Sequence, residues 1–288
     1  MERKDLLIGI IQPGGFLATE SGKILLTERY EEPGQGSEGI PLEIAPEDIG
    51  KMAFAKGNLS KKVLYGAKIV EILSPVTGGL INSLADKGIV SLEEIREQLS
   101  KLESEDPEGR GQRKKCALVI GHKKTSPGAV NAKTGVHEFG FNEGLALRIE
   151  GKATKTEVQR IYRRTYKELP GDINQYNPDF TVSLHCNAFN KRASGTEVLY
   201  YHKSQKGKVI AEILQQALVE HLQLPDRGVK PKSSEDRGGY LLRYTKAPCV
   251  IAESFFIDNN KDLARAQEEL EGLAGAFANA LDTISLIM

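Results

Sequence analysis

The chain has 288 residues, of which 40% are hydrophobic, which is enough apolar content for one large domain or for a large and a small one. Its 39 Lys and Arg residues balance its 39 Asp and Glu residues. This balance argues against the global positive field by which proteins bind nucleic acid or an anionic membrane surface. No apolar segment approaches the roughly 20 residues that a transmembrane helix needs, so we expect no membrane span.

Local patterns also argue against an export signal and against disulfides or metal sites built from cysteine. The apolar stretch that begins at Leu6 is short and runs into Gln-Pro-Gly-Gly without a small-residue cleavage site, so we identify no signal peptide. Cys116, Cys186 and Cys249 lie in or beside apolar runs, where a thiol behaves as a small hydrophobic group. Their spacing predicts neither a disulfide framework nor a Cys-X-X-Cys metal site.

The first predicted domain, residues 1–75, consists of short apolar runs separated by Gly and Pro. Regularly spaced short strands with turn signals are typical of a small β-barrel of the OB or SH3 type. The runs are LLIGII, GFLA, KILLTERY, IPLEIA and KKVLYGAKIVEIL. The stretch EEPGQGSEG, residues 31–39, has the composition of an exposed loop.

Residues 76–113 are predicted to hold a helix and a charged linker. Ser91 and Glu94 form a capping-box pattern, and apolar residues recur at helical intervals through SLEEIREQLSKL, residues 91–102. The following stretch, ESEDPEGRGQRKK, is charged and nearly devoid of apolar residues. Such a composition marks a linker, so we place the domain boundary there.

Residues 114–288 have a different sequence pattern from the first domain, because buried strand candidates alternate with helix candidates. The strand candidates are CALVIGH, EVQRIYR, FTVSLH, TEVLYY and CVIAESFF. The helix candidates are EFGFNEGLALRIEGKA, KGKVIAEILQQALVEHL and KDLARAQEELEGLAGAFANALDTI. This alternation predicts an α/β domain with a twisted mixed β-sheet flanked by helices.

Three of the strand candidates end in a side chain that can bind a metal or move a proton. CALVIGH ends in His122, FTVSLH ends in His185, and CVIAE ends in Glu253. Ligands of open α/β sheets usually bind in the crevice outside the carboxyl ends of the strands. An imidazole at a strand end can also serve only to bond a nearby carbonyl, but three such residues together predict a site.

A fourth candidate lies at the start of the helix EFGFNEGLALRI, where His137 and Glu138 are neighbours and one of them is expected to face the sheet edge. Two histidines, one carboxylate and an open fourth position form a catalytic zinc set, which would leave Glu253 as the general base. A carboxylate in the first turn of a helix also complements the helix dipole without any metal. The spacing alone supports both interpretations of Glu138 equally.

The order of motifs from Cys116 to Ile284 resembles that of the zinc-dependent N-acetylmuramoyl-L-alanine amidases, the family of bacterial septal amidases and several phage lysins. The motifs are Gly121-His122 after a strand, SPGAVN, Glu138 with Asn142 before Leu-Ala-Leu, SLHCNAF, SGTEVLYY, DRGVK and LLRYTKAPCVIAESFFIDNNKDL. The resemblance implies that His122, Glu138 and His185 hold a zinc ion. It also implies that Glu253 is the catalytic glutamate.

This chain departs from the family's usual pattern at three places without losing a ligand. It has VIGHKKTSPG where Asp-Pro-Gly-His-Gly-Gly is usual, so the turn beyond His122 is expected to differ. Cys186 replaces a small alanine, and AESFF replaces Glu-Leu-Gly-Phe.

The resemblance implies a peptidoglycan hydrolase that cleaves the amide between N-acetylmuramic acid and L-alanine. Zinc would activate a water, and Glu253 would take its proton and return it to the leaving amine. Two alternatives stay open: a zinc peptidase that cuts a stem-peptide amide, and a cell-wall-binding protein without catalysis. The four filled chemical positions argue against the second.

The remaining candidates near the site are weaker. Cys186 should face away from His185, because adjacent strand residues point to opposite faces, so a Cys-His nucleophile is disfavoured. Asn187 shares the face of His185 and is a candidate for binding substrate, although a turn-forming role is at least as well supported. His202 and His221 have no partner pattern and are expected at the surface or in the core.

The expected partner is peptidoglycan, and the expected place of action is the periplasm or the extracellular cell wall. Because no export signal is visible, the sequence favours release by a lysis system, as in phage lysins, or a leader that has been removed. The chain has no Trp, so aromatic platforms for sugar stacking are not evident in the N-terminal domain. That domain is expected to bind cell wall, bind a partner or cover the site.

Overall fold

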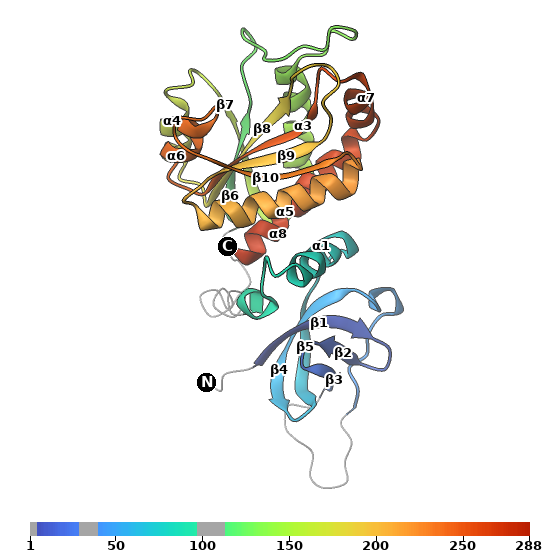
Figure 1. Cartoon of the computed structure of the whole chain (residues 1–288). Coiled ribbons are helices and arrows are strands. Elements are labelled where there is room, and N and C mark those ends of the chain that lie inside the picture. Colours follow the sequence, from blue (N-terminus) through green and yellow to red (C-terminus); the bar gives the residue numbers. More distant parts are fainter. Residues whose placement is uncertain (1–4, 29–39, 97–112) are drawn as a thin grey trace. The chain divides into compact units, whose positions relative to one another are not determined.

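The structure is a computed structural model that describes residues 5–28, 40–96 and 113–288 (Figure 1). The chain divides into two compact units, Met1–Gly111 and Gln112–Met288, which are described separately. No helix within the described ranges is long and apolar enough to cross a lipid bilayer.

The first unit contains a closed five-stranded barrel in the order β1-β2-β3-β5-β4, which confirms the predicted small β-barrel. Neighbouring strands are antiparallel except for β3 and β5, which pair in parallel. The strands are β1 (Asp5–Gln12), β2 (Phe16–Thr19), β3 (Gly22–Leu26), β4 (Met52–Ser60) and β5 (Val63–Ile72).

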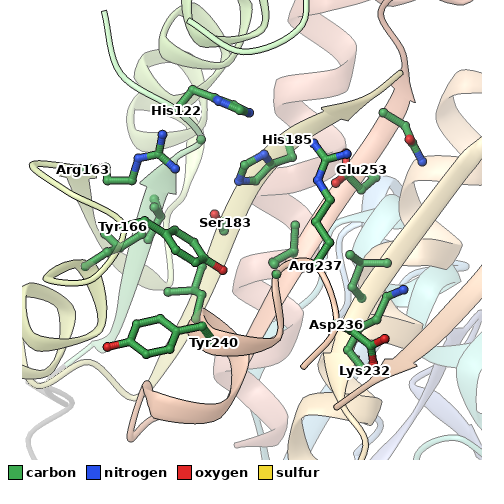
Figure 2. A pocket seen from close by; sticks show the side chains of 18 of the residues that line it. His122, Arg163, Tyr166, Ser183, His185, Lys232, Asp236, Arg237, Tyr240 and Glu253 are labelled. Atoms are coloured by element: carbon green, nitrogen blue, oxygen red, sulfur yellow. The ribbon is translucent and has the colours of Figure 1, made fainter. Parts of the chain in front are cut away.

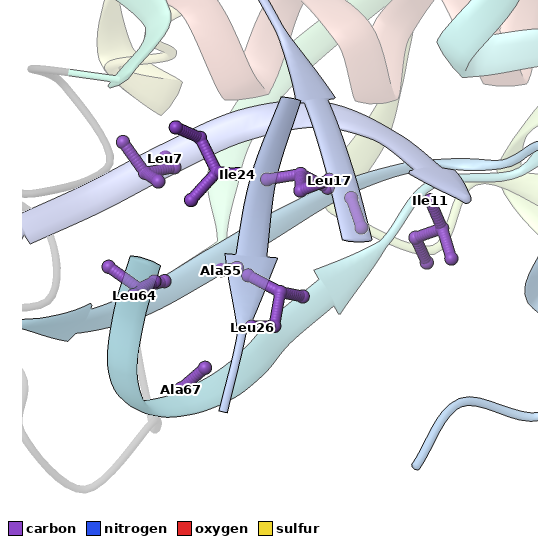
Figure 3. Close-up of a cluster of buried hydrophobic side chains, with 9 residues drawn as sticks. Leu7, Ile11, Leu17, Ile24, Leu26, Ala55, Leu64 and Ala67 are labelled. Carbon is purple, nitrogen blue, oxygen red and sulfur yellow. The ribbon is translucent and has the colours of Figure 1, made fainter. Parts of the chain in front are cut away.

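Small and branched aliphatic side chains fill the barrel (Figure 3). The cluster consists of Leu7, Ile11, Leu17, Ile24, Leu26, Ala53, Ala55, Leu64 and Ala67. Within β1, β3 and β4 its members recur at every second or fourth position, as expected for side chains that share the inner face of a sheet. In β5, Leu64 and Ala67 are three positions apart, across a register shift in the pairing of β4 and β5. The barrel therefore has a packed interior of its own.

Three details of the first unit differ from the sequence prediction. Strand β4 is absent from the predicted runs, because Ala, Gly and Lys interrupt its apolar pattern. The run IPLEIA forms no strand beyond a single bridge between Pro41 and Thr27, and it is followed by a short 3-10 helix, Pro46–Asp48. A helix that was not predicted, α1 (Pro75–Asp86), begins with Ser74 as its N-cap.

Parts of the predicted connecting segment lie outside the described residues. Residues 92–96 are helical, in agreement with the start of the predicted helix at 91–102, and its remainder is outside the description. The predicted loop 31–39 and most of the predicted linker also lie outside it. The last linker residues, Lys114 and Lys115, belong to the first strand of the second unit.

The second unit contains a six-stranded sheet in the order β10-β9-β11-β8-β6-β7 (Figure 1). All neighbours are parallel except β9 and β11, so the sheet is mixed, as predicted. The strands are β6 (Lys114–Ile120), β7 (Thr156–Tyr162), β8 (Phe180–Asn187), β9 (Thr196–Tyr201), β10 (Asp226–Lys232) and β11 (Cys249–Phe256).

Helices cover both faces of this sheet. On one face, α4 (Leu169–Tyr176) and α6 (Gly239–Tyr244) pack on Ala117, Val119 and Ile251. The other face is covered by α3 (Glu138–Lys152), α5 (Gln205–Leu222) and α8 (Leu270–Ile287). The long helix expected at 261–284 is divided at Glu269 into α7 (Asn260–Glu268) and α8.

The strand ends differ from those expected at the candidate site. Strand β6 ends at Ile120, so His122 lies in the following loop. Strands β8 and β11 continue past His185 and Glu253, to Asn187 and Phe256. His185 and Glu253 are nevertheless neighbours, because they pair with each other in the parallel register of β8 and β11.

The boundary near residue 114 remains a prediction that a fragment can test. We expect residues 114–288 to fold alone, since this stretch contains the whole six-stranded sheet and the helices on both faces. A fragment 121–288 is the matched control, because it lacks β6, which pairs with both β7 and β8. Circular dichroism and thermal melting should show cooperative unfolding for the first fragment only. Insolubility of fragment 114–288 would mean that the two units depend on each other.

Candidate metal centre and adjoining pocket

His122 lies in the loop after β6 and adopts a left-handed backbone conformation with φ of 68°. Two glycines near His122 leave room for the side chains of the site. A Cβ atom on Gly121 would lie 2.7 Å from the ring of His185, and one on Gly128 would lie 2.6 Å from Oε2 of Glu138. Real Cβ atoms do not approach other atoms so closely, so both positions require glycine.

Glu138 is the first residue of α3 and is almost completely buried, with 2% of its surface exposed. Its Oε1 accepts a hydrogen bond from the backbone N–H of Cys186 at 3.0 Å, and its Oε2 accepts one from Ala129 at 3.2 Å. Burial alone would raise the pKa of Glu138, but contacts with His122 and His185 outweigh burial and hold the pKa well below its ordinary value. The carboxylate therefore stays ionised.

His137, the other candidate at this helix start, faces a different partner. It is the N-cap of α3, and its Nδ1 accepts a hydrogen bond from the backbone N–H of Gly140 at 3.1 Å. The imidazole thus satisfies one of the free N–H groups at the helix start, as a capping side chain does. Of the two neighbours, the structure brings Glu138 to the histidines.

His122, Glu138 and His185 form one cluster. Nδ1 of His185 lies 2.9 Å from Oε1 of Glu138, and Nε2 of His122 lies 3.1 Å from its Oε2. The two imidazole rings meet edge to face with their centroids 5.2 Å apart. Burial lowers the pKa of His185, but the hydrogen bond with Glu138 and the charges of Glu253 and Glu138 together outweigh burial and keep the pKa above its ordinary value.

The cluster has the donor set of a divalent metal site. One ligand atom from each of the three residues lies within 4.8 Å of the others, and roughly 3.4 Å is the separation of two ligands on a tetrahedral zinc. Nε2 of His122 is buried and has no hydrogen-bond partner among the described residues, despite its proximity to Glu138. An unpaired buried nitrogen is costly unless something else binds it. The residues therefore fit zinc.

Glu253 lies beside this cluster on the neighbouring strand, on the same face of the sheet as His185. Its Oε2 is also buried without a hydrogen-bond partner among the described residues. Burial raises the pKa of Glu253 to about 7, an effect that the charge of His185 partly offsets. A carboxylate with such a pKa can both accept and donate a proton near neutral pH.

A pocket of about 420 Å³ opens next to the cluster, on the face of the sheet that α4 and α6 cover (Figure 2). His122, His185 and Glu253 line it together with Leu199, Ile251 and other residues of the sheet. The volume is in the range of a site for a small ligand or a short peptide segment.

The other predicted residues have more ordinary partners. Asn187 lines the pocket, but its Nδ2 donates to Glu197 at 2.8 Å and its Oδ1 accepts from the backbone of Ala188. The thiol of Cys186 contacts Asn142 of α3 at 3.7 Å, and burial raises its pKa, so it does not suit a nucleophile. His202 is exposed and contacts the backbone carbonyl of Lys232.

His221 is partly buried and lies 3.6 Å from Glu269, away from the pocket lining. No role in the site was predicted for His221, and it does not line the pocket.

Several pocket residues were missed in the sequence. Arg163 follows β7 directly, so the reasoning applied to the strand ends of His122 and His185 would have found it. Arg237 and Tyr240 come from the segment between β10 and β11, where no apolar run ends and no motif marks them. Tyr166 also lines the pocket, between β7 and α4.

The sequence is similar to known bacterial proteins. The sequence is 28% identical over 176 residues to the uncharacterized protein YqiI of Bacillus subtilis, which spans 58% of this chain and 82% of that protein. It is 27% identical over 157 residues to the N-acetylmuramoyl-L-alanine amidase LytC of the same organism, which spans 51% of this chain and 30% of LytC. The chain therefore matches less than a third of the length of LytC.

Solved structures show the same fold in the second unit. An N-acetylmuramoyl-L-alanine amidase from Clostridium difficile 630 is 20% identical with a TM-score of 0.51, over 60% of this chain and 94% of that one. The catalytic domain of CwlV from Bacillus (Paenibacillus) polymyxa var. colistinus is 24% identical with a TM-score of 0.51, over 58% and 96%. The sequence profile of the N-acetylmuramoyl-L-alanine amidases matches residues 116–283. Through these residues the chain belongs to the N-acetylmuramoyl-L-alanine amidase family.

Proposed function

We propose that this protein is a zinc-dependent peptidoglycan hydrolase that cleaves the amide between N-acetylmuramic acid and L-alanine. The observation that carries the proposal is the cluster of His122, Glu138 and His185 next to Glu253, beside a pocket in a domain of the amidase family. Peptidoglycan is the partner, and the cell wall outside the cytoplasm is the place of action.

In this proposal the three clustered side chains hold the metal, with Glu138 as an ionised ligand. When bound, zinc supplies an acidified water and polarises the carbonyl of the amide. Glu138 is kept in place by the N–H groups of Ala129 and Cys186, which orient its carboxylate.

Glu253 is the proposed general base and acid. Its unpaired Oε2 accepts the proton of the attacking water and then returns it to the nitrogen of the leaving amine. This transfer is required because an amide ion is a very poor leaving group. A pKa raised by burial to about 7 suits a group that must do both in one turnover.

Digestion of purified peptidoglycan tests the bond that is cut. We expect release of free stem peptides with L-alanine at the amino terminus and intact glycan strands, because the attacked carbonyl belongs to the lactyl group. Mass spectrometry of the soluble products reads the new amino termini. New termini that all lie beyond L-alanine would show a stem-peptide peptidase instead, and absence of any release would remove the catalytic proposal.

A further inference from the structure

The charged side chains that line the pocket differ in their partners. Glu197 accepts hydrogen bonds from Arg227 at 2.8 Å and from Asn187 at 2.8 Å. Asp236 accepts from the backbone N–H of Ser233 at 2.6 Å and from its hydroxyl at 2.9 Å. These two carboxylates are therefore engaged within the protein, as is Glu235 of the lining, which accepts from the hydroxyl of Ser234 at 2.5 Å. Glu253 is the carboxylate of the lining that interacts electrostatically with Arg237.

Two arginines of the lining, Arg163 and Arg237, form no ion pair or hydrogen bond with any described residue. They lie on opposite sides of His185, with Arg163 next to His122 and Arg237 next to Glu253 (Figure 2). Arg163 lies near a ring, with its guanidinium carbon 5.8 Å from the centroid of Tyr166. A guanidinium without a partner beside a pocket is well placed to bind a carboxylate in bidentate fashion.

The backbone that carries Arg237 is fixed by hydrogen bonds. It lies in the tight segment between β10 and α6, where the side chain of Asp236 bonds to Ser233. The backbone N–H of Gly239 in turn donates to the carbonyl of Asp236 at 2.8 Å. Because this segment is held at both sides of Arg237, binding a ligand there costs little backbone entropy, and the remaining cost is that of ordering the arginine side chain.

The proposed mechanism sets the direction in which a substrate lies in the pocket. Glu253 returns a proton to the leaving amine, so the peptide side of the cleaved amide must lie on the side of Glu253, where Arg237 also lies. In peptidoglycan the residue after L-alanine is D-glutamate linked through its side chain. Its α-carboxyl group is thus either free and negatively charged or amidated and neutral.

We propose that Arg237 binds the free α-carboxylate of the D-glutamate that follows L-alanine, and so makes the enzyme prefer stem peptides in which this group is not amidated. The inference rests on the proposed function, because it takes the orientation of the substrate from Glu253. Arg163 lies on the opposite side of His185 and has no part in this discrimination.

Two ligands that differ only at this group provide the test: N-acetylmuramoyl-L-alanyl-D-glutamate and N-acetylmuramoyl-L-alanyl-D-isoglutamine. With the zinc-loaded full chain, we expect a KM about tenfold lower for the acid than for the amide. Arg237→Gln should raise the KM of the acid about tenfold, leave kcat within about twofold and leave the amide unaffected. Arg237→Lys should retain part of the preference, since it keeps the charge and loses the fork.

Arg163→Gln and Arg164→Gln are the matched controls. The first removes the other unpaired guanidinium of the pocket, and the second removes its neighbour, which pairs with Asp172 at 2.5 Å. Both should keep the preference for the acid. If the preference for the acid were lost in Arg163→Gln but kept in Arg237→Gln, Arg163 would be the arginine that binds the carboxylate, and the proposal would be overturned.

Binding to the Glu253→Gln variant, measured by calorimetry with the same two ligands, separates this inference from the proposed function. In this background Arg237→Gln is then added and binding is measured again. If the wild-type chain cleaves neither ligand but the added Arg237→Gln removes the preference for binding the acid, the recognition stands and the proposed activity fails. If the wild-type chain cleaves both and the added Arg237→Gln leaves the ratio of the two affinities unchanged, the recognition is refuted and the activity stands.

Discussion

Glu253→Gln is expected to lower kcat by about a thousandfold while the protein keeps its fold and its zinc. The amide side chain has nearly the same shape as the carboxylate, but it cannot accept the proton of the attacking water. The effect should be this large because Glu253 is the one carboxyl group that lines the pocket, pairs in register with His185 and has an oxygen without a hydrogen-bond partner in the described part of the chain.

Release of soluble peptide from purified peptidoglycan measures the rate, and elemental analysis measures the zinc. Glu268→Gln is the control, since it makes the same chemical change at an exposed residue of α7 that does not line the pocket. It should retain wild-type turnover. Turnover of Glu253→Gln within a few-fold of wild type would show that another group is the base.

Loss of metal is the second large effect that we expect. The purified protein should contain about one zinc per chain, and His122→Ala and His185→Ala should each reduce this to a small fraction. Each substitution removes one of the three proposed ligands, and two remaining ligands would hold zinc poorly. Elemental analysis after gel filtration in metal-free buffer gives the stoichiometry, and full occupancy in both variants would refute the site.

The neighbours at the start of α3 provide an internal control for this experiment. Glu138→Ala should weaken zinc binding, because it removes the carboxylate that contacts both histidines. His137→Ala should leave zinc in place and only remove the hydrogen bond to Gly140, at a cost of about 1 kcal/mol in stability. The reverse result would mean that His137 is the ligand.

Most of the second unit was predictable because its central strands, such as β8 and β11, are buried on both faces and so appear as continuous apolar runs. The edge strand β10, with the polar sequence DRGVKPK, is partly exposed and was missed. The apolar runs also revealed the site, since a polar residue such as His185 or Glu253 stands out in such a run. What the sequence misplaced was the end of each strand. Polar residues are compatible with a strand that passes the edge of its core, so β8 and β11 continue beyond these positions.

The choice between His137 and Glu138 could not be made from the sequence. The sequence does not show whether the helix begins at His137 or at Glu138, and only the placement of α3 against β8 decides which of them faces the sheet edge. In the structure His137 is the extended N-cap and Glu138 is the first helical residue. The place of Arg237 in the pocket could not be predicted either, because it depends on a short segment whose conformation is set by hydrogen bonds of Asp236. In the first unit, β4 was missed because alanine and glycine give a weak apolar signal.

His122 shows a conflict between stability and chemistry at a single residue. A side chain with φ of 68° makes the folded state less favourable by about 1 kcal/mol or more than glycine would at that position. The free energy of unfolding would therefore favour glycine at residue 122, in a loop that already contains Gly121 and Gly128. Favourable interactions elsewhere in the second unit must offset this cost. A substitution that destabilises the domain would therefore act on a protein whose free energy of unfolding is already reduced by the conformation of His122.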